Sequence, residues 1–318
     1  MPRSIAAAIA ALLVAVIAAL AAPAASAAPV FPTGLRVGLE TPPGLVVSRR
    51  LPGFEDPDHK VLVAIFELPG IAYDQIMQAG FDKQTHGMTD VTKSDFTTAG
   101  GTGYLVTGET KVNDQGQHRW FLMARPNGSG KGTPVTGLVR VDVPDTARQV
   151  YSDAVVRKML ASVDFRPTPT QELLGLLPFK LGNLADFRVA RVLPGGVILT
   201  DGPSDEIGKA KQPYIIVSVG RGGPSDPALR GNFARDMLRS GPLNDLTVTS
   251  SDTIRIGRAP AYELRAKAKD PTGEDVTVVQ WLRFGTGGYM RVIGVAPANT
   301  WDKLFNRFRA VRDGVASR

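Results

Sequence analysis

Three histidines are the main acid–base and metal-binding groups of this 318-residue chain, because it contains no cysteine. They are His59, His86 and His118. Only His59 has several carboxylates just before it in the sequence, namely Glu55, Asp56 and Asp58. Such a set could bind a divalent ion or act as acid and base, which would make the first half of the chain a small hydrolase or metal-dependent enzyme. No metal-ligand spacing supports this alternative, so we expect a solvated polar loop from Gly53 to His59.

Motifs that present a nucleophile or a phosphate are incomplete. The sequence has no Gly-x-Ser-x-Gly elbow for a catalytic serine. The stretch Gly128–Thr133 resembles a phosphate loop, but Gly132 interrupts the pattern and the stretch joins two expected strands. Gly220–Gly223 precedes a helix and could hold an anion with the help of Arg221. We therefore predict no catalytic residue and no cofactor.

Basic residues are the remaining candidates for ligand binding, and they concentrate in the second half. Residues 28–167 hold 15 Lys and Arg against 15 Asp and Glu, whereas residues 168–318 hold 21 against 15. The candidates lie on two expected helices and on the loop before one of them: Arg221, Arg235, Arg239, Lys303, Arg307, Arg309 and Arg312. They could meet an anionic envelope component or a protein partner, while nucleic acid is not expected. A solvated basic surface explains them more simply.

The N-terminus predicts export. Arg3 precedes an apolar run, and Ala25-Ser26-Ala27 has the form that signal peptidase cleaves, so residues 1–27 are expected to be removed after Ala27. Retention of this segment as an anchor is the alternative. No later segment is apolar enough to span a membrane. We expect a periplasmic or secreted protein without disulfides.

The same order of sequence features occurs twice along the chain. Trp120 stands where Trp281 stands, and Gly137–Val141 matches Gly288–Val292. Gly101–Tyr104 and Ala259–Tyr262 open the two corresponding stretches. We therefore predict a first domain over residues 28–166, a Pro-rich linker with a short apolar segment over 167–177, and a second domain over 178–318. Leu173, Leu174, Leu176 and Leu177 are expected to form a helical turn at a contact between the two copies.

The elements expected in the two copies are strands and helices in equivalent order. The first copy should have strands at 60–68, 94–98, 104–111, 117–124 and 136–143, with helices at 73–85 and 146–163. The second should have strands at 186–193, 197–200, 214–219, 246–249, 253–256, 261–268, 276–284 and 289–294, with helices at 226–239 and 299–315. Gly116 is expected to supply positive φ in the turn after Asn113. Asn299 or Thr300 is expected to cap the last helix.

This order resembles the PsbP-like and Mog-like α/β/α fold of exported proteins. The resemblance rests on Pro52–Pro57 before a buried strand and on the strand from Tyr289 to Gly294. It implies an α+β fold in two tandem domains, each with an antiparallel sheet flanked by helices. It implies no functional residue, because proteins of this fold bind different partners. The preferred hypothesis is a periplasmic, non-enzymatic binding or accessory protein of the cell envelope with an unknown ligand.

Overall fold

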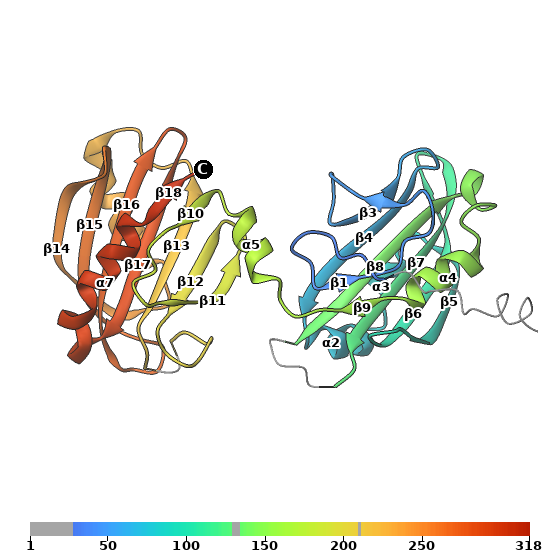
Figure 1. The fold of residues 1–318 in the computed structure, drawn as a ribbon, viewed down its shortest axis with the longest axis horizontal. Coiled ribbons are helices and arrows are strands. Elements are labelled where there is room, and N and C mark those ends of the chain that lie inside the picture. Colours follow the sequence, from blue (N-terminus) through green and yellow to red (C-terminus); the bar gives the residue numbers. More distant parts are fainter. Residues whose placement is uncertain (1–27, 129–133, 209–210) are drawn as a thin grey trace, which may run out of the picture. The chain divides into compact units, whose positions relative to one another are not determined.

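The computed structural model describes residues 28–128, 134–208 and 211–318. The chain divides into two compact units, Met1–Thr168 and Pro169–Arg318, which we call the first and the second domain (Figure 1). The expected signal segment and residues 129–133 of the phosphate-loop-like stretch lie outside the described residues. No helix in the described ranges is long and apolar enough to cross a membrane.

The first domain is built on a seven-stranded antiparallel sheet with the order β2-β3-β4-β8-β7-β6-β5. Its strands are β2 (Val46–Val47), β3 (Gly53–Asp56), β4 (Val61–Pro69), β5 (Thr89–Thr97), β6 (Gly101–Val112), β7 (Gln115–Pro126) and β8 (Val135–Pro144). The central strand β4 is rich in β-branched and other apolar residues, as expected of a strand covered on both faces. A separate two-stranded pair joins β1 (Val37–Gly38) to β9 (Asp164–Phe165).

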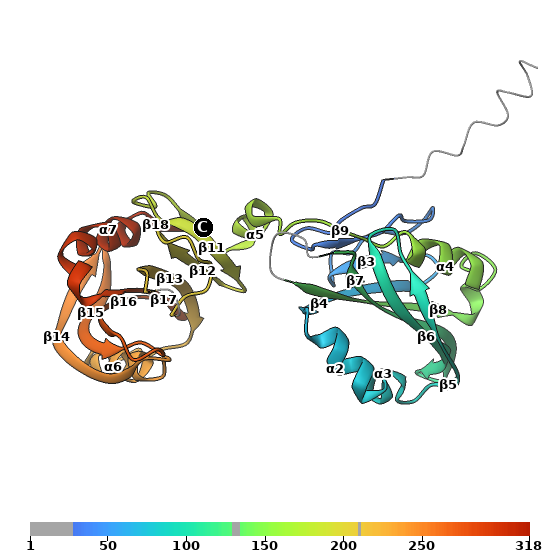
Figure 2. The ribbon, with the colours of Figure 1, turned by 90° about the horizontal axis from the view of Figure 1, so that it is seen from below.

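Helices cover both faces of this sheet. One face carries α2 (Ala72–Ala79) and α3 (Asp82–Thr85), whose Tyr73 and Phe81 pack near Phe121. The other carries the 3-10 turn η1 (Asp145–Ala147) and α4 (Asp153–Ala161), which bury Trp120 and Leu122. Figure 2 shows α2 and α4 on opposite sides.

The second domain repeats this plan with the sheet order β11-β12-β13-β17-β16-β15-β14. Its strands are β10 (Phe179–Leu181), β11 (Arg188–Leu193), β12 (Gly196–Thr200), β13 (Tyr214–Arg221), β14 (Asn244–Ile256), β15 (Ala259–Lys269), β16 (Asp275–Gly285), β17 (Gly288–Pro297) and β18 (Val315–Ser317). Its helices are α5 (Thr170–Leu176), η2 (Pro227–Leu229), α6 (Arg230–Arg239), η3 (Ala298–Thr300) and α7 (Trp301–Asp313). The predicted two-domain α+β fold is confirmed by these two sheets.

The register of the two sheets reproduces most of the predicted repeat. Trp120 pairs with Val141, and Trp281 pairs with Val292, so these positions are equivalent. The proposed match of Tyr104 with Tyr262 is wrong by two residues. Trp120 pairs with Thr107 on β6, whereas Trp281 pairs with Glu263 on β15. Thr107 and Glu263 are therefore equivalent positions. Tyr104 lies three residues before Thr107, and Tyr262 lies one residue before Glu263. Both distances are odd, so the two tyrosines still point to the same face, because strand side chains alternate.

Three predicted elements differ from the structure in their backbone conformation. The expected polar loop from Gly53 begins as the buried strand β3. The expected helix at 73–85 is broken where Gly80 and Phe81 both adopt positive φ. The β6–β7 turn takes its positive φ from Asn113 and Asp114, which tolerate that conformation, and not from Gly116.

Three further differences concern the boundaries of elements. The strands expected at 246–249 and 253–256 are one strand, β14, with register shifts along it. The closing helix of the first domain is shorter than expected and begins after Ser152, whose hydroxyl accepts from the Val155 N–H. No side chain caps α7, because the Thr300 hydroxyl donates to the Pro297 carbonyl instead.

The leucine-rich segment belongs to the packing of the second domain. Residues 170–176 form α5, which agrees with the expected helical turn. Leu177 is buried in the core of the second domain, and Leu174 packs against that core. Leu176 is exposed.

Candidate functional site

The acidic residues before His59 do not form a common site, because β3 separates them. Glu55 and Asp56 are neighbours on a strand, so their side chains point to opposite faces of the sheet. Glu55 accepts from the Arg50 guanidinium, which is the first cause of its lowered pKa. Among the described residues, no group of three or more His, Asp or Glu is placed to hold a metal ion.

Asp56 is instead the centre of a buried hydrogen-bond network. Its Oδ2 accepts from the Tyr151 hydroxyl at 2.6 Å and contacts His59 Nδ1 at 2.8 Å. Its Oδ1 accepts from the backbone N–H groups of Asp58 and His59. Burial alone would raise the pKa of Asp56, but these donors lower it below its usual 3.8. Asp56 therefore connects the turn after β3, through Asp58 and His59, to Tyr151 just before α4.

The other two histidines lie elsewhere in the first domain. His118, on β7, contacts Glu109 through Nδ1 at 2.7 Å and Thr107 through Nε2. Its ring lies 4.1 Å from that of Trp120. His86 ends α3. The structure brings the three histidines into three different environments.

The basic candidates near α6 are partly engaged in the fold. Arg235 donates to Asn232 and to Ser251 on β14. Arg221 and Arg239 are exposed, and neither forms an ion pair with a residue that the structure describes. Of the three predicted candidates near α6, these two are therefore the ones that carry a positive charge without a partner among the described residues.

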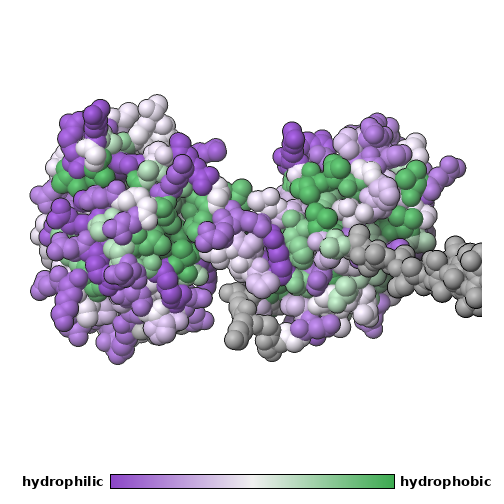
Figure 3. Space-filling model, viewed as in Figure 1, coloured by the Kyte–Doolittle hydropathy of each residue, from purple (hydrophilic) through white to green (hydrophobic). Residues whose placement is uncertain are grey.

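Two of the basic candidates on α7 have partners within the fold, and the other two are exposed. Arg307 forms an ion pair with Asp201 at 2.6 Å and donates to the Ala185 carbonyl. Arg312 lies 4.9 Å from the Trp281 ring and pairs with Asp313. Lys303 and Arg309 are exposed. Figure 3 shows hydrophilic residues over much of the side of the second domain that carries α7.

The two helices do not combine these residues into one basic face. α6 packs on one core of the second domain through Ala234 and Leu238, and α7 packs on the other through Leu304 and Phe308. Figure 2 shows them on opposite sides of the sheet. The basic residues of the two helices therefore lie on opposite faces of the sheet.

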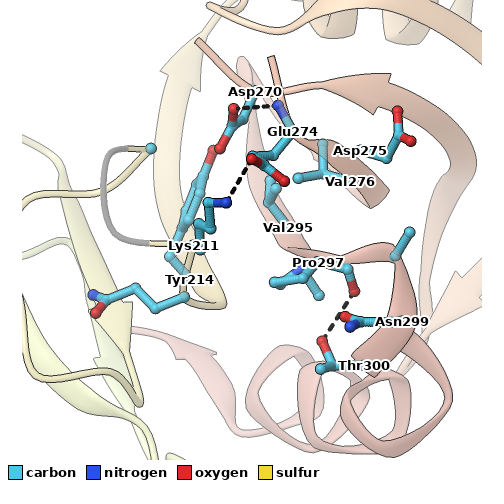
Figure 4. A pocket seen from close by; sticks show the side chains of 14 residues that line it. Lys211, Tyr214, Asp270, Glu274, Asp275, Val276, Val295, Pro297, Asn299 and Thr300 are labelled. Atoms are coloured by element: carbon cyan, nitrogen blue, oxygen red, sulfur yellow. Dashed lines mark hydrogen bonds and ion pairs between the residues drawn. The ribbon is translucent and has the colours of Figure 1, made fainter. Parts of the chain in front are cut away.

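A hollow of about 630 Å³ in the second domain is a different and better-formed candidate, of the size typical of ligand sites (Figure 4). It lies where β13 and β16 begin and where β15 and β17 end. Its walls are Val276, Val295, Ala296 and Pro297, and its polar groups are Lys211, Gln212, Tyr214, Asp270, Glu274, Asp275, Asn299 and Thr300. Gln212 fixes the nearby loop by donating to Thr200 and to the Ser204 carbonyl.

Two carboxylates of this hollow have lysine partners, and the third does not. Glu274 lies 2.5 Å from Lys211 Nζ, and Asp275 lies 2.9 Å from Lys269 Nζ. Asp270 is only 4% exposed and forms no ion pair with a described Lys or Arg.

Asp270 nevertheless stays charged because its own hairpin supplies hydrogen-bond donors. Its Oδ1 accepts from Thr272 Oγ1 at 2.6 Å and from the N–H groups of Thr272 and Glu274 at 2.8 and 3.1 Å. Burial alone would raise the pKa of Asp270, but these donors lower it. All three bonds end on Oδ1, so Oδ2 accepts no hydrogen bond from another described residue.

Tyr214 is the polar group opposite Asp270. It is 6% exposed, and Figure 4 shows its ring reaching from β13 toward Asp270. Burial and then the charge of Asp270 raise its pKa to about 12, so the hydroxyl is protonated at neutral pH. Within the described ranges its hydroxyl makes no hydrogen bond.

The first domain has a hollow of about 510 Å³ at the equivalent end of its sheet. Val63 pairs with Val141 as Val217 pairs with Val292, so Val63 and Val217 are equivalent positions. Three residues before each of them stand Lys60, just ahead of β4, and Tyr214, at the start of β13. The turn η1 after β8 occupies the place of η3 after β17. The lining residues differ: they are Asp58, His59, Lys60, Gln115, Gly116, Pro144, Asp145, Thr146 and Ala147.

Sequence reasoning missed both hollows, although one signal was available. Asp270-Pro271-Thr272-Gly273 has the composition of a hairpin turn, and an Asp followed by Thr two residues later is a frequent way to fix such a turn. Nothing local indicated that Tyr214 would lie opposite it, because the two segments meet only through the sheet.

Comparisons with known proteins give similar structures but no family. No protein-family model matches the chain, and no curated protein sequence matches it. The chain is similar to LpqN, involved in cell envelope biogenesis of Mycobacterium tuberculosis, with 19% identity over 43% of this chain and 82% of that one and a TM-score of 0.34.

Two further similar structures correspond to the predicted resemblance. The Saccharomyces cerevisiae Ran-binding protein Mog1p has 15% identity over 41% of this chain and 85% of its own, with a TM-score of 0.31. Cyanobacterial PsbP from Synechocystis sp. PCC 6803 has 12% identity over 40% and 76%, with a TM-score of 0.28. Both kinds of protein named from the sequence are thus among the similar structures.

Proposed function

We propose that this chain is an exported, non-enzymatic binding or accessory protein of the cell envelope, which takes a small ligand at the hairpin end of its sheets. The observation that carries the proposal is the hollow at the same end of both domains. A repeated hollow with different linings is what a duplicated binding module would keep while its two copies specialise. Export is supported by the form of residues 1–27, with Ala25-Ser26-Ala27 before the cleavage position.

The test uses the full chain, purified from the envelope fraction of cells that express it. We expect a mature N-terminus at Ala28 and a small molecule that remains bound in native mass spectrometry. Ala298→Trp should fill the hollow of the second domain, and Thr146→Trp the hollow of the first, because both residues are exposed lining positions. Loss of the bound mass in one variant but not in the other would assign the ligand to one domain.

The control is unfolding temperature, which neither substitution should lower by more than a few degrees, since neither changes the core. Retention of the bound mass by both variants, or a chain recovered with residues 1–27 in the cytoplasm, would contradict the proposal. A hydrolytic or redox activity that co-purifies and is lost on one point substitution would contradict its non-enzymatic part.

A further inference from the structure

We propose that the hollow of the second domain binds a primary ammonium group carried on an aliphatic chain, with Asp270 Oδ2 and the Tyr214 hydroxyl as its polar partners. This inference rests on the proposed binding function and names the chemical class of its ligand. It is carried by two largely buried residues that line one hollow, Asp270 and Tyr214. Asp270 Oδ2 and the Tyr214 hydroxyl have no hydrogen-bond partner among the described residues.

The charge of Asp270 argues for a cationic ligand. A carboxylate that is removed from water is costly unless it is paired and hydrogen-bonded. The hairpin satisfies Oδ1, but it supplies no positive charge and leaves Oδ2 without a donor. The hollow is lined by three carboxylates and one lysine, which gives it a net negative charge although the domain as a whole is basic. A ligand cation would complete the pair.

Tyr214 argues for a group with N–H donors. Its hydroxyl oxygen can accept a hydrogen bond while its proton goes to another acceptor. Tyr214 and Asp270 line the same hollow, and Figure 4 shows the tyrosine ring reaching toward Asp270, so one donor group placed there would contact both. A primary ammonium has three N–H donors and is compact enough for this position.

The walls argue for an aliphatic chain behind the ammonium group. Val276, Val295 and Ala296 line the hollow beside the two polar groups. Val276 and Val295 keep a small exposed surface that an alkyl chain would contact, whereas Ala296 is fully buried behind them. The lysines at the rim are not available for an anionic ligand, because Lys211 and Lys269 already pair with Glu274 and Asp275.

The test titrates the full mature chain with n-butylammonium and follows amide resonances of Gly273 and Val276 by NMR. n-Butanol has nearly the same shape without the charge, and tetramethylammonium has the charge without N–H donors. We expect n-butylammonium to bind at least about tenfold more tightly than either, because charge-assisted hydrogen bonds are the strong ones. Binding should weaken as ionic strength rises.

Substitutions in the hollow separate its groups. Asp270→Asn keeps an oxygen acceptor for the hairpin and removes the charge, so n-butylammonium affinity should fall about tenfold or more. Tyr214→Phe removes only the hydroxyl and should weaken binding about three- to tenfold. Asp252→Asn is the matched control, because this carboxylate on β14 is exposed and does not line the hollow, and it should change affinity less than about twofold.

Equal binding of n-butanol and n-butylammonium, or unchanged affinity in both Asp270→Asn and Tyr214→Phe, would overturn the inference. Should Asp270→Asn unfold the hairpin, the Tyr214→Phe result decides. A further outcome is that n-butylammonium does not bind, while Ala298→Trp still removes a bound native ligand. That result would reject the ligand class and leave the proposed function intact.

Discussion

At the residue scale, the most informative groups are carboxylates buried under hydrogen bonds. Asp56 and Asp270 are both almost fully buried, and each accepts backbone N–H groups from the turn that follows it. They differ in their remaining oxygen. Asp56 Oδ2 is bound by Tyr151 and His59, whereas Asp270 lines a hollow and its Oδ2 accepts no hydrogen bond from another described residue. This difference separates a structural carboxylate from a candidate ligand group.

Asp56→Ala should lower the free energy of unfolding of the first domain by about 2–4 kcal/mol, because it leaves the buried Tyr151 hydroxyl and two N–H groups without an acceptor. Asp58→Ala, in the same turn but exposed, should cost less than about 0.5 kcal/mol. Native-state hydrogen exchange of β4 amides measures both. Equal effects of the two substitutions would show that the network does not stabilise the domain.

The contribution of Asp56 should also depend on pH in a defined direction. Its pKa in the folded chain lies below its usual 3.8, so its ionised form favours folding. The stabilisation is complete at neutral pH and is lost as the pH falls from about 3.8 through the lower folded pKa. The difference between the native chain and Asp56→Ala should therefore shrink in that acidic range.

At the scale of elements, breaks and turns are set by residues that accept positive φ. Gly80 and Phe81 end α2 and begin α3 in the left-handed region. Phe81 is buried at 4% exposure and stacks on Tyr104, with ring centroids 5.1 Å apart. Packing of this ring therefore offsets the backbone strain that a bulky residue has at positive φ.

Gly80→Ala tests this break, because φ is +82° at Gly80 and no atom lies within 4 Å of an added Cβ. Only the backbone conformation is penalised, so the first domain should lose about 1 kcal/mol of stability. Gly175→Ala in α5 is the opposite case, with the same open space and no positive φ. It should stabilise the second domain by about 0.5–1 kcal/mol, as alanine does in helices. Urea denaturation of each variant checks both signs, and a stabilising Gly80→Ala would contradict this reading of the break.

At the scale of the whole molecule, the two domains share a topology but differ in charge. The first domain is balanced, and the second has six more basic than acidic residues. Arg307 and Arg312 are engaged in the fold, and the exposed cations are divided between two faces of the sheet. Each domain has its own hydrophobic cores. Separate expression of the two domains is therefore a reasonable experiment.

Residues 169–318 should be retained by anionic vesicles more strongly than residues 28–168, with binding that falls steeply as salt rises. The division of the basic residues between two faces predicts weak retention, lost near about 0.15 M salt where the Debye length is about 8 Å. Lys303→Gln with Arg309→Gln should reduce retention, whereas Lys180→Gln on β10 serves as a charge control outside the two helices. Equal retention of both domains at low salt would contradict a role for the second domain in anion binding.

The sequence by itself determined the duplicated plan, most strands and the closing helices, because alternation and helical spacing are local properties of the chain. It also determined that Trp120 and Trp281 occupy equivalent positions in the two copies. Only the tertiary structure decided that β3 is a strand, since Asp56 needs Tyr151 and Arg50 pairs with Glu55 across a turn. It likewise decided the hollow of the second domain. Tyr214 and Asp270 both line it because β13 begins, and the β15–β16 hairpin turns, at the same end of one sheet. No local pattern encodes which distant strands will pair.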